Sequence, residues 1–259
     1  MGSLLLLNKL FPVLNLRLLI VLLAFSASLA TLISSFYSTY QVQKEQLINH
    51  TLKSNYAYAN KLASATDNFL ESAKQQLAYS ANKIEQNIND ASLLQEEVTR
   101  LNLQTNSFNS VVINKNGIIH VTSPYLPEII GKSISSPGSS QALKEKKPLI
   151  SMPYMSAAKN LIIFISHPLF DKNGNYLGYI GGSLYLKERN ILNDLLEQHF
   201  YEGGSHIYVV DGNKQILYHP DKKRIGTSVT NNKVINAVIT GQSGQVTVLN
   251  SKNVEMLAG

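Results

Sequence analysis

A long stretch near the N-terminus contains neither proline nor glycine, the two residues that most often interrupt a helix. It lies between Pro12 and Gly117. Within it, apolar and small residues recur mostly in steps of three, four or seven, which predicts a helix from about residue 42 to residue 88 with one apolar stripe. Such a helix would be about 70 Å long, which is too long to bury against one small domain, so we expect it to serve several surfaces.

The first part of the stretch has the length and composition of a membrane helix. Residues 18–36 are 19 successive positions without a charged side chain, and a helix of that length covers most of a bilayer core. A cleaved signal peptide is the alternative, with Ser28-Leu29-Ala30 as the cleavage site. The apolar run continues past that site, which favours a membrane helix that is retained.

The charges around the apolar run predict its orientation. Lys9 and Arg17 precede it, and the first acidic residue after it is Glu45. By the positive-inside rule, the N-terminus faces the cytoplasm and the bulk of the chain faces the periplasm or the exterior. The predicted boundaries are a cytoplasmic N-terminus at 1–17 and a single transmembrane helix at 18–38, in the inner membrane.

Composition argues against several classes of function. The 259 residues include no cysteine, hence no disulfide and no thiolate metal site. The six histidines show no metal-ligand spacing and no serine stands in a nucleophile elbow, so we expect no catalytic residue, no metal and no cofactor. The formal net charge of +6 is spread over short clusters without interleaved aromatic residues, which is typical of a solvated face and not of a nucleic-acid site.

The rest of the chain shows hairpin patterns. The apolar run 161–166 ends at His167-Pro168, Asn173-Gly174 favours a tight turn, and 176–186 returns as the partner strand. Three glycines stand inside that returning strand: Gly178, Gly181 and Gly182. They indicate a close approach to the sheet by a ligand, by a helix, or at a bulge, and the sequence leaves these alternatives open.

Two parts of the chain look alike. Hairpin patterns at 110–121 and 206–219 are each followed by a polar loop and then by a helix-like stretch, at 139–146 and 231–240. An internal repeat of about 95 residues is longer than a solenoid unit. It predicts two copies of one small α/β module, joined by a helix from residue 187 to about residue 200.

Four segments carry a family resemblance: Val-Val-Ile-Asn-Lys-Asn-Gly, Lys-Pro-Leu-Ile-Ser-Met-Pro-Tyr, Leu-Gly-Tyr-Ile-Gly-Gly-Ser-Leu-Tyr-Leu and Val-Val-Asp-Gly-Asn-Lys-Gln-Ile-Leu-Tyr-His-Pro-Asp. In this order they resemble the double Cache sensor domains of bacterial transmembrane receptors, most of all those of membrane-bound diguanylate cyclases. The resemblance implies an α+β fold with one N-terminal transmembrane helix, and two tandem PAS-like modules with antiparallel sheets. The implied boundaries are 39–104 for a long stalk helix and a short second helix, 105–190 for the membrane-distal module, and 191–259 for an incomplete membrane-proximal module.

The resemblance also implies a function. Such a chain is the extracytoplasmic, small-molecule-sensing input module of a membrane receptor, truncated before its output domain, and forms a homodimer through the long helix. The output domain would be a diguanylate cyclase or, alternatively, a chemoreceptor signalling region or a histidine kinase, and the chain itself would not be an enzyme. A membrane-anchored periplasmic hydrolase is the rival from another class.

The ligand class follows from one departure. In amino-acid-binding relatives, an aspartate in a Gly-Gly-Asp segment holds the ammonium group, and an arginine with a tryptophan holds the carboxylate. Ser183 stands at the aspartate position here, and the chain has no tryptophan. Loss of a hydrogen bond to a charged group costs about 1.5–3 kcal/mol, so we expect a carboxylate or a neutral metabolite rather than an amine. The alternative is a closed module, with Phe164 filling the core. The predicted ligand-binding residues are Tyr125, Met152, Tyr154, Ser156, Phe164, Ser166, Tyr179, Gly181 and Ser183.

Overall fold

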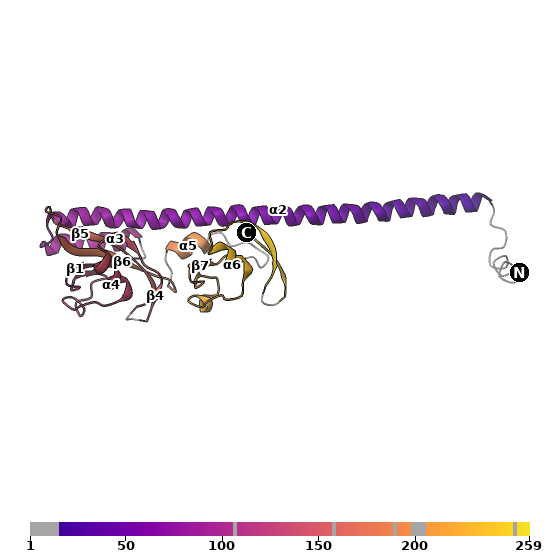
Figure 1. Ribbon diagram of the computed structural model, residues 1–259. Coiled ribbons are helices and arrows are strands. Elements are labelled where there is room, and N and C mark those ends of the chain that lie inside the picture. Colours follow the sequence, from indigo (N-terminus) through magenta and orange to yellow (C-terminus); the bar gives the residue numbers. More distant parts are fainter. Residues whose placement is uncertain (1–15, 106–107, 157–158, 189–190, 198–205, 251–252) are drawn as a thin grey trace.

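One helix dominates the molecule. The computed structural model describes residues 16–105, 108–156, 159–188, 191–197, 206–250 and 253–259. Its main element is α2 (Leu16–Gln86), a helix of 71 residues, which at 1.5 Å per residue is about 105 Å long. Both folded modules lie along one side of this helix, and its N-terminal part projects beyond them (Figure 1). The predicted membrane helix and the predicted stalk are therefore one continuous helix.

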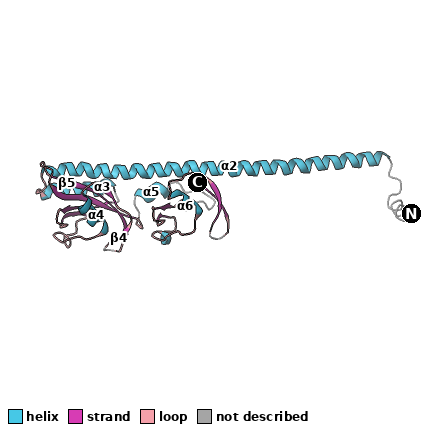
Figure 2. Ribbon diagram, in the orientation of Figure 1, coloured by secondary structure: helices cyan, strands magenta, loops and turns pink. Residues whose placement is uncertain are grey.

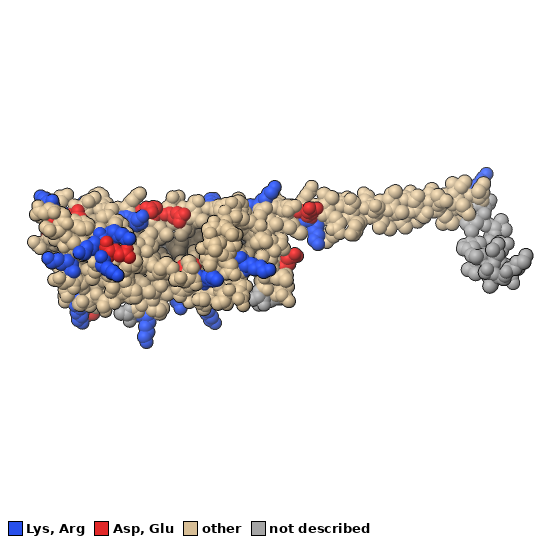
Figure 3. Space-filling view, in the orientation of Figure 1, with Lys and Arg blue, Asp and Glu red and all other residues tan. Residues whose placement is uncertain are grey.

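The projecting part of α2 is uncovered. Among the residues that the structure describes, α2 is the one helix long and apolar enough to cross a membrane; the mean hydropathy of its apolar window is 2.3, and none of that window is buried. Figure 3 shows this part as a rod without charged side chains between the modules and its far end. Exposed apolar surface of this extent is unfavourable in water and favourable in lipid, so the segment has the properties of a membrane anchor. Residues 1–15, most of the predicted cytoplasmic segment, lie outside the described part of the chain.

A tight turn after α2 leads into α3 (Ala91–Thr105). Asp90 caps this helix, since its Oδ1 accepts the backbone N–H of Ser92 at 3.0 Å. The sequence predicts a break here, because residues 89–92 (Asn-Asp-Ala-Ser) include N-cap types and Ser92 and Gln95 have capping-box spacing. The break and a cap among these residues are confirmed, but the capping box is wrong, because Gln95 donates its side-chain amide to the carbonyl of Thr122 at 3.2 Å instead. The carboxylate of Asp90 already satisfies the first N–H groups of the helix.

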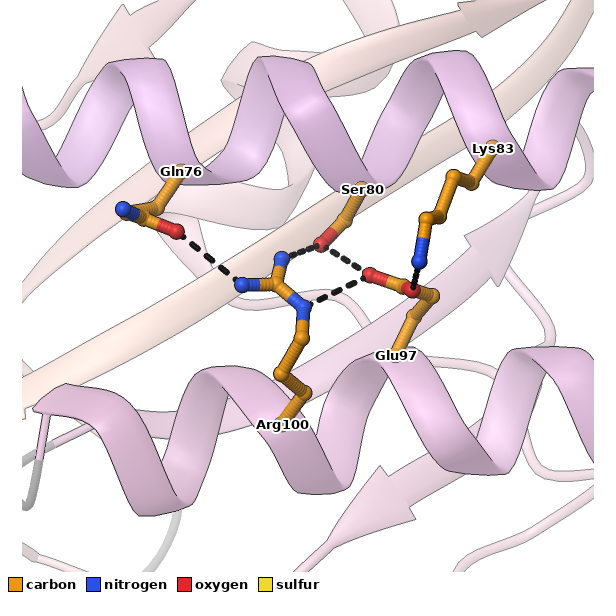
Figure 4. Close-up of polar contacts among 5 residues, drawn as sticks. All are labelled: Gln76, Ser80, Lys83, Glu97 and Arg100. Carbon is orange, nitrogen blue, oxygen red and sulfur yellow. Dashed lines mark hydrogen bonds and ion pairs between the residues drawn. The ribbon is translucent and has the colours of Figure 1, made fainter.

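A buried ion cluster ties α2 to α3 (Figure 4). The Glu97 side chain of α3 is 0% exposed. Its carboxylate accepts hydrogen bonds from Lys83 Nζ at 2.9 Å, Arg100 Nε at 3.0 Å and Ser80 Oγ at 2.8 Å. Burial alone would raise the pKa of this carboxyl, but the bonds from Lys83, Ser80 and Arg100 outweigh burial and lower it. The bond to Glu97 likewise raises the pKa of Lys83. The cluster therefore holds α3 in a defined position on α2 while Glu97 is ionised.

The distal module is a six-stranded sheet in the order β2-β1-β6-β5-β3, with β4 paired to β5. Every pairing in it is antiparallel. The helices α2 and α3 cover one face of this sheet, and α4 (Pro137–Glu145) covers the other (Figure 2). The strands are β1 (Phe108–Asn114), β2 (Ile119–Ser123), β3 (Leu149–Ile150), β4 (Tyr154–Met155), β5 (Leu161–Phe170) and β6 (Tyr176–Tyr185).

Strand β5 is longer than its sequence predicts. It continues through Pro168, although the His167-Pro168 pair is expected to end it. Its pairing with β3 stops at Ser166, so beyond that point one side of β5 is an edge where the missing N–H of a proline is tolerated. On α2, Glu85 Oε1 accepts the backbone N–H of Phe170 at 2.8 Å. A side chain of the long helix therefore caps this edge.

The hairpin turns share one device. In the β5–β6 turn, Asp171 Oδ1 accepts the backbone N–H groups of Asn173 and Asn175, both at 2.8 Å. The residue between them, Gly174, has a φ of 81°. In the other three hairpin turns, the side chain of the first residue likewise accepts the backbone N–H of the fifth residue; these first residues are Asn114, Asp211 and Asn250. The fourth residue of each turn has a positive φ; these residues are Gly117, Lys214 and Asn253.

The proximal module is smaller. It contains α5 (Ile191–Glu197), β7 (Val209–Val210), β8 (Ile216–Tyr218), the 3-10 turn η1 (Lys222–Arg224), α6 (Lys233–Val238), β9 (Val246–Leu249) and β10 (Glu255–Ala258). Its strands form two antiparallel pairs, β7-β8 and β9-β10. Strand β10 lies against α2, where Asn55 donates its side-chain amide to the carbonyl of Leu257 at 2.8 Å. The α+β class with antiparallel sheets is confirmed. In the connecting helix, predicted from residue 187 to about residue 200, residues 187 and 188 are not helical, and residues 189–190 and 198–200 lie outside the described residues.

Candidate functional site

The face of the distal sheet under α4 differs from the face under α2. Both faces carry aliphatic side chains. The face under α4 carries in addition the buried Phe164 and Tyr179 rings and the buried hydroxyl group of Ser166. In the register of β5 and β6, Phe164 lies opposite Ser183, and Ser166 lies opposite Gly181. Because side chains alternate along a strand, these four predicted residues share one face, and Tyr179 lies on it as well.

Helix α4 lies close to this face because of its first residues. Ser136 caps the helix, with its side chain accepting the N–H of Ser139 at 3.3 Å. A β-carbon at Gly138 would lie 2.9 Å from the Phe164 ring and 2.8 Å from the Tyr154 hydroxyl. Only glycine therefore allows α4 to approach the sheet so closely. We call the resulting cluster the α4 face: Ser136, Gly138, Ser139, Tyr154, Phe164, Ser166, Tyr179, Gly181 and Ser183.

Two phenols bond α4 to the sheet. The Tyr179 hydroxyl donates to Ser139 Oγ at 2.7 Å, and the Tyr154 hydroxyl lies 3.3 Å from Ser136 Oγ. The Phe164 and Tyr179 rings meet edge to face, with 5.8 Å between centroids. Burial raises the pKa of both Tyr154 and Tyr179, so both phenols stay protonated at neutral pH. The α4 face therefore offers hydroxyl donors and aromatic walls.

Protein groups occupy the space that the β6 glycines leave open. A β-carbon at Gly181 would lie 2.5 Å from the tip of the Phe164 ring. Gly182, on the other face, is covered in the same way by the Phe108 ring, and Gly178 by the backbone at Ile113. In this conformation Phe164 fills the centre of the α4 face, as the closed-module alternative expects, so a ligand has to displace its ring.

Two buried hydroxyls in this module lack a partner among the described residues: Ser166 Oγ and Tyr176 Oη. Ser166 is 1% exposed. Tyr176 begins β6, and Lys146, which ends α4, places its Nζ 5.2 Å from the centroid of the Tyr176 ring. Burial raises the pKa of Tyr176 to about 12. A buried hydroxyl without a partner costs about 1–3 kcal/mol, so such groups are commonly positioned for a ligand or a water molecule.

Three predicted site residues are not brought to this cluster. Tyr125, in the loop after β2, is 64% exposed, and Met152, between β3 and β4, is 50% exposed. Ser156 serves the turn into β5, where its hydroxyl accepts the N–H of Asn160 at 3.2 Å. Their assignment to the site stays a prediction without a contact to support it.

Sequence reasoning missed the α4 side of the cluster. The Ser136-Pro137 pair is a signal for a helix start, with serine as the cap and proline in the first turn. This pair alone would have predicted a helix that begins at Pro137, as the structure has it, and not at Ser139. Nothing in the local sequence indicates which face of the sheet the helix covers, so Gly138 was not identified as a contact of Phe164.

Comparison with known proteins identifies the family. A family model described as a Cache domain, of the double Cache type, matches residues 39–258. The chain belongs to the Cache domain family. A Cache domain is a sensory fold and not a catalytic one. No curated protein matches the chain.

Solved Cache structures are similar to the chain at low identity. The sensory domain of the Campylobacter jejuni chemoreceptor Tlp3 with isoleucine bound has a TM-score of 0.62 and 17% identity, covering 83% of this chain and 89% of that one. The ligand-binding domain of the Pseudomonas aeruginosa amino acid chemoreceptor PctC in complex with GABA has a TM-score of 0.59 and 17% identity, covering 80% and 90%. An extracellular ligand-binding receptor from Desulfohalobium retbaense has a TM-score of 0.57 and 15% identity; the match covers 74% of this chain and spans only 35% of that receptor. At these identities the likeness shows the Cache fold.

Proposed function

We propose that the chain is the extracytoplasmic input module of a bacterial membrane receptor and that its distal module binds a small molecule at the α4 face. Three features support this proposal: the Cache family match over 39–258, the uncovered apolar part of α2, and the character of the α4 face. The observation that carries it is the buried Ser166 hydroxyl, which has no partner among the described residues and lies beside a glycine instead of a bulky side chain.

The ligand we propose is a carboxylate or a neutral polar metabolite. Isoleucine and GABA, which are bound by the Tlp3 and PctC domains, each carry an ammonium and a carboxylate group. None of the residues of the α4 face is acidic, and Ser183 stands where an aspartate would hold an ammonium. The hydroxyls of Ser166 and Tyr154 can donate to carboxylate, carbonyl or hydroxyl oxygens.

Binding requires a second arrangement of the module. The Phe164 ring has to leave the space above Gly181 for a ligand to enter. A ligand that binds only the open arrangement shifts the population toward it, by as much as its affinities for the two arrangements differ. Strand β5 carries Phe164 and also contacts α2 through Phe170 and Glu85, so a shift in β5 is passed directly to the long helix.

The receptor that receives this signal is part of the proposal. We propose that the chain lies in the inner membrane and dimerises along the uncovered side of α2. A chemoreceptor output is supported by the likeness to chemoreceptor sensory domains. The diguanylate cyclase output rests on the sequence resemblance alone, and a histidine kinase is the third alternative. Sequencing of the parent genomic reading frame on both sides of this chain tests which output follows.

The ligand site is tested by a binding screen. The purified full chain in detergent is titrated calorimetrically with carboxylates, neutral polar metabolites and amines. We expect carboxylates or neutral compounds to bind, Ser166→Ala and Tyr154→Phe to weaken that binding about tenfold or more, and Ser228→Ala, on the proximal module, to leave it unchanged. Preferential binding of amines, undisturbed by the Ser166 and Tyr154 substitutions, would show both the site and the ligand class to be wrong.

A further inference from the structure

A second polar cluster lies in the proximal module, well separated in sequence from the α4 face. Its residues are His206, Tyr208, His219, Arg224 and Asn232, and we call it the His–Arg cluster. The ring centroids of His206 and His219 are 5.4 Å apart, those of His206 and Tyr208 are 6.1 Å apart, and those of Tyr208 and His219 are 6.2 Å apart. Residues from the two sides of the β7–β8 hairpin, from η1 and from the cap of α6 therefore converge at one place.

The His219 ring receives more hydrogen-bond donors than it can accept. Its Nδ1 accepts the backbone N–H of Asp221 at 2.9 Å, while its Nε2 lies 3.0 Å from Nη1 of Arg224. A guanidinium group donates and never accepts, and a neutral imidazole has one accepting nitrogen. In every protonation state of His219, at least one of these two donors is therefore left without an acceptor on the ring.

Neighbouring groups add to this surplus of donors. The Tyr208 hydroxyl oxygen accepts from the Asn232 amide at 3.3 Å, and within the described residues its own proton has no acceptor. Burial raises the pKa of Tyr208, against the bond from Asn232 and the charge of Arg224, so it stays protonated. Arg224 is exposed and forms no ion pair with any carboxylate that the structure describes, so its remaining N–H groups face solvent, where a ligand can reach them. The N–H groups of Arg224 and the O–H group of Tyr208 would therefore be satisfied by a ligand group that has only hydrogen-bond acceptors.

We propose that the His–Arg cluster binds a small oxyanion, the carboxylate or phosphate group of a metabolite. The Arg224 guanidinium would donate hydrogen bonds to one or two oxygens of the oxyanion, and the Tyr208 hydroxyl would donate a further hydrogen bond to it. Guanidinium groups favour carboxylate and phosphate because both present oxygens at the spacing of the N–H fork. The site is independent of the α4 face and gives the proximal module a ligand of its own.

Binding at this site is linked to protonation. Burial lowers the pKa of His219, and the charges of Arg224 and His206 lower it further, while Asp221 opposes them. The ring of Tyr208 also faces His219. An oxyanion beside Arg224 offsets its positive charge, so binding raises the His219 pKa toward its ordinary value. We expect the chain to take up protons when it binds an oxyanion at a pH between the lowered His219 pKa and the ordinary histidine value.

The test uses inorganic phosphate and acetate on the purified full chain in detergent, with chloride as the reference at equal ionic strength. We expect phosphate, acetate or both to raise the midpoint of thermal unfolding above that in chloride. The anion that raises it more shows whether the site prefers a phosphate or a carboxylate group. Arg224→Gln should weaken calorimetric binding about tenfold or more. Lys222→Gln removes an exposed cation of the same turn and should leave binding unchanged.

Two measurements guard against misfolding and against a general salt effect. Arg224→Lys keeps the charge but not the fork, so it should fold and bind more weakly than the wild type. Titration at a pH between the lowered His219 pKa and the ordinary histidine value, in two buffers of different ionisation enthalpy, measures the proton uptake directly. Equal responses of Arg224→Gln and Lys222→Gln, or no anion-specific response of the wild type, would overturn the proposal. Ser166→Ala should not change oxyanion binding, so failure here is distinct from failure at the α4 face.

Discussion

Among single residues, Ser166 is the one whose hydroxyl should lower the stability of the ligand-free protein and strengthen ligand binding. It is buried in the centre of β5 without a partner among the described side chains. Its neighbour across the strand pair is Gly181, which offers no side chain to bond. A group of this kind destabilises the empty protein and becomes useful only when a ligand satisfies it.

Substitution of Ser166 by alanine should therefore have two opposite effects. Without ligand, we expect the free energy of unfolding to rise by about 1 kcal/mol, because a buried hydroxyl without a partner is replaced by hydrogen. With ligand, we expect affinity to fall. Chemical denaturation with and without ligand measures both effects, and Ser228→Ala, at an exposed position of the proximal module, serves as the comparison. A loss of stability in the empty protein would mean that Ser166 already has a partner.

Sequence reasoning at this scale succeeded where strand alternation decides the answer. Alternation along the two predicted strands puts Phe164 with Ser166, and Gly181 with Ser183, on common faces, and the register of β5 and β6 places them so. It could not place side chains in loops, because no period relates a loop residue to the sheet. Tyr125 is such a residue. It also could not decide between a ligand and the module's own Phe164 ring as the cause of the glycine at 181.

At the scale of elements, the ion cluster between α2 and α3 makes stability depend on pH. The Glu97 pKa is lowered in the folded protein, so its contribution is present above the ordinary carboxyl pKa and is lost as pH falls through the folded value. The Lys83 pKa is raised, so its contribution is present below the ordinary lysine pKa and is lost as pH rises through the folded value. The ion cluster therefore stabilises the packing of α3 on α2 most strongly across the neutral pH range.

Glu97→Gln should destabilise the protein at pH 7 by about 1.5–3 kcal/mol, because Lys83 and Arg100 lose their charged acceptor. The difference from wild type should shrink as pH falls below about 4, where the wild-type carboxyl is protonated as well. Thermal unfolding between pH 3 and pH 8 measures this. Glu71→Gln, which breaks an exposed pair with Lys74 on α2, is the control and should change stability little. A difference that is constant with pH would contradict the assignment.

The hairpin turns give a pair of substitutions with opposite signs. Gly174 has a φ of 81° and open space around it, so Gly174→Ala should cost about 1 kcal/mol through backbone strain alone. Lys214 holds the equivalent position in the β7–β8 turn with a φ of 64°. Lys214→Gly should relieve that strain and stabilise by up to about 1 kcal/mol. Chemical denaturation compares them, and changes of the same sign would show that the turns are not equivalent.

Elements were predicted more accurately than their ends. The long helix and the hairpins follow from periodicity and turn residues, which are local properties. The passage of β5 through Pro168 depends on another segment, because β3 ends early, and Gln95 bonds to the carbonyl of Thr122 on β2 instead of completing a capping box. Such ends are set by tertiary contacts, and a single sequence does not display them.

At the scale of the whole molecule, the prediction concerns topology. The chain has no cysteine, so single cysteines can be introduced without a background. In intact cells, a membrane-impermeant thiol reagent should label Ser72→Cys, which is exposed on α2, once the outer membrane is permeabilised. It should label Ser3→Cys only after lysis of the inner membrane. Labelling of both in intact cells would exclude the predicted orientation, and recovery of a chain that starts at Thr31 would establish the signal peptide.

The contact of Asn55 with Leu257 has a consequence for the order in which the molecule is made. It joins positions 202 residues apart, so it forms only after Leu257 has left the ribosome. The segments of the distal module pack on the C-terminal end of α2 and follow that helix directly in sequence, so the distal module can fold while synthesis continues. The part of the helix around Asn55 stays uncovered until β10 has been made. The module farther from the predicted membrane segment can therefore fold first, and the contact of β10 with α2, nearer to that segment, forms later.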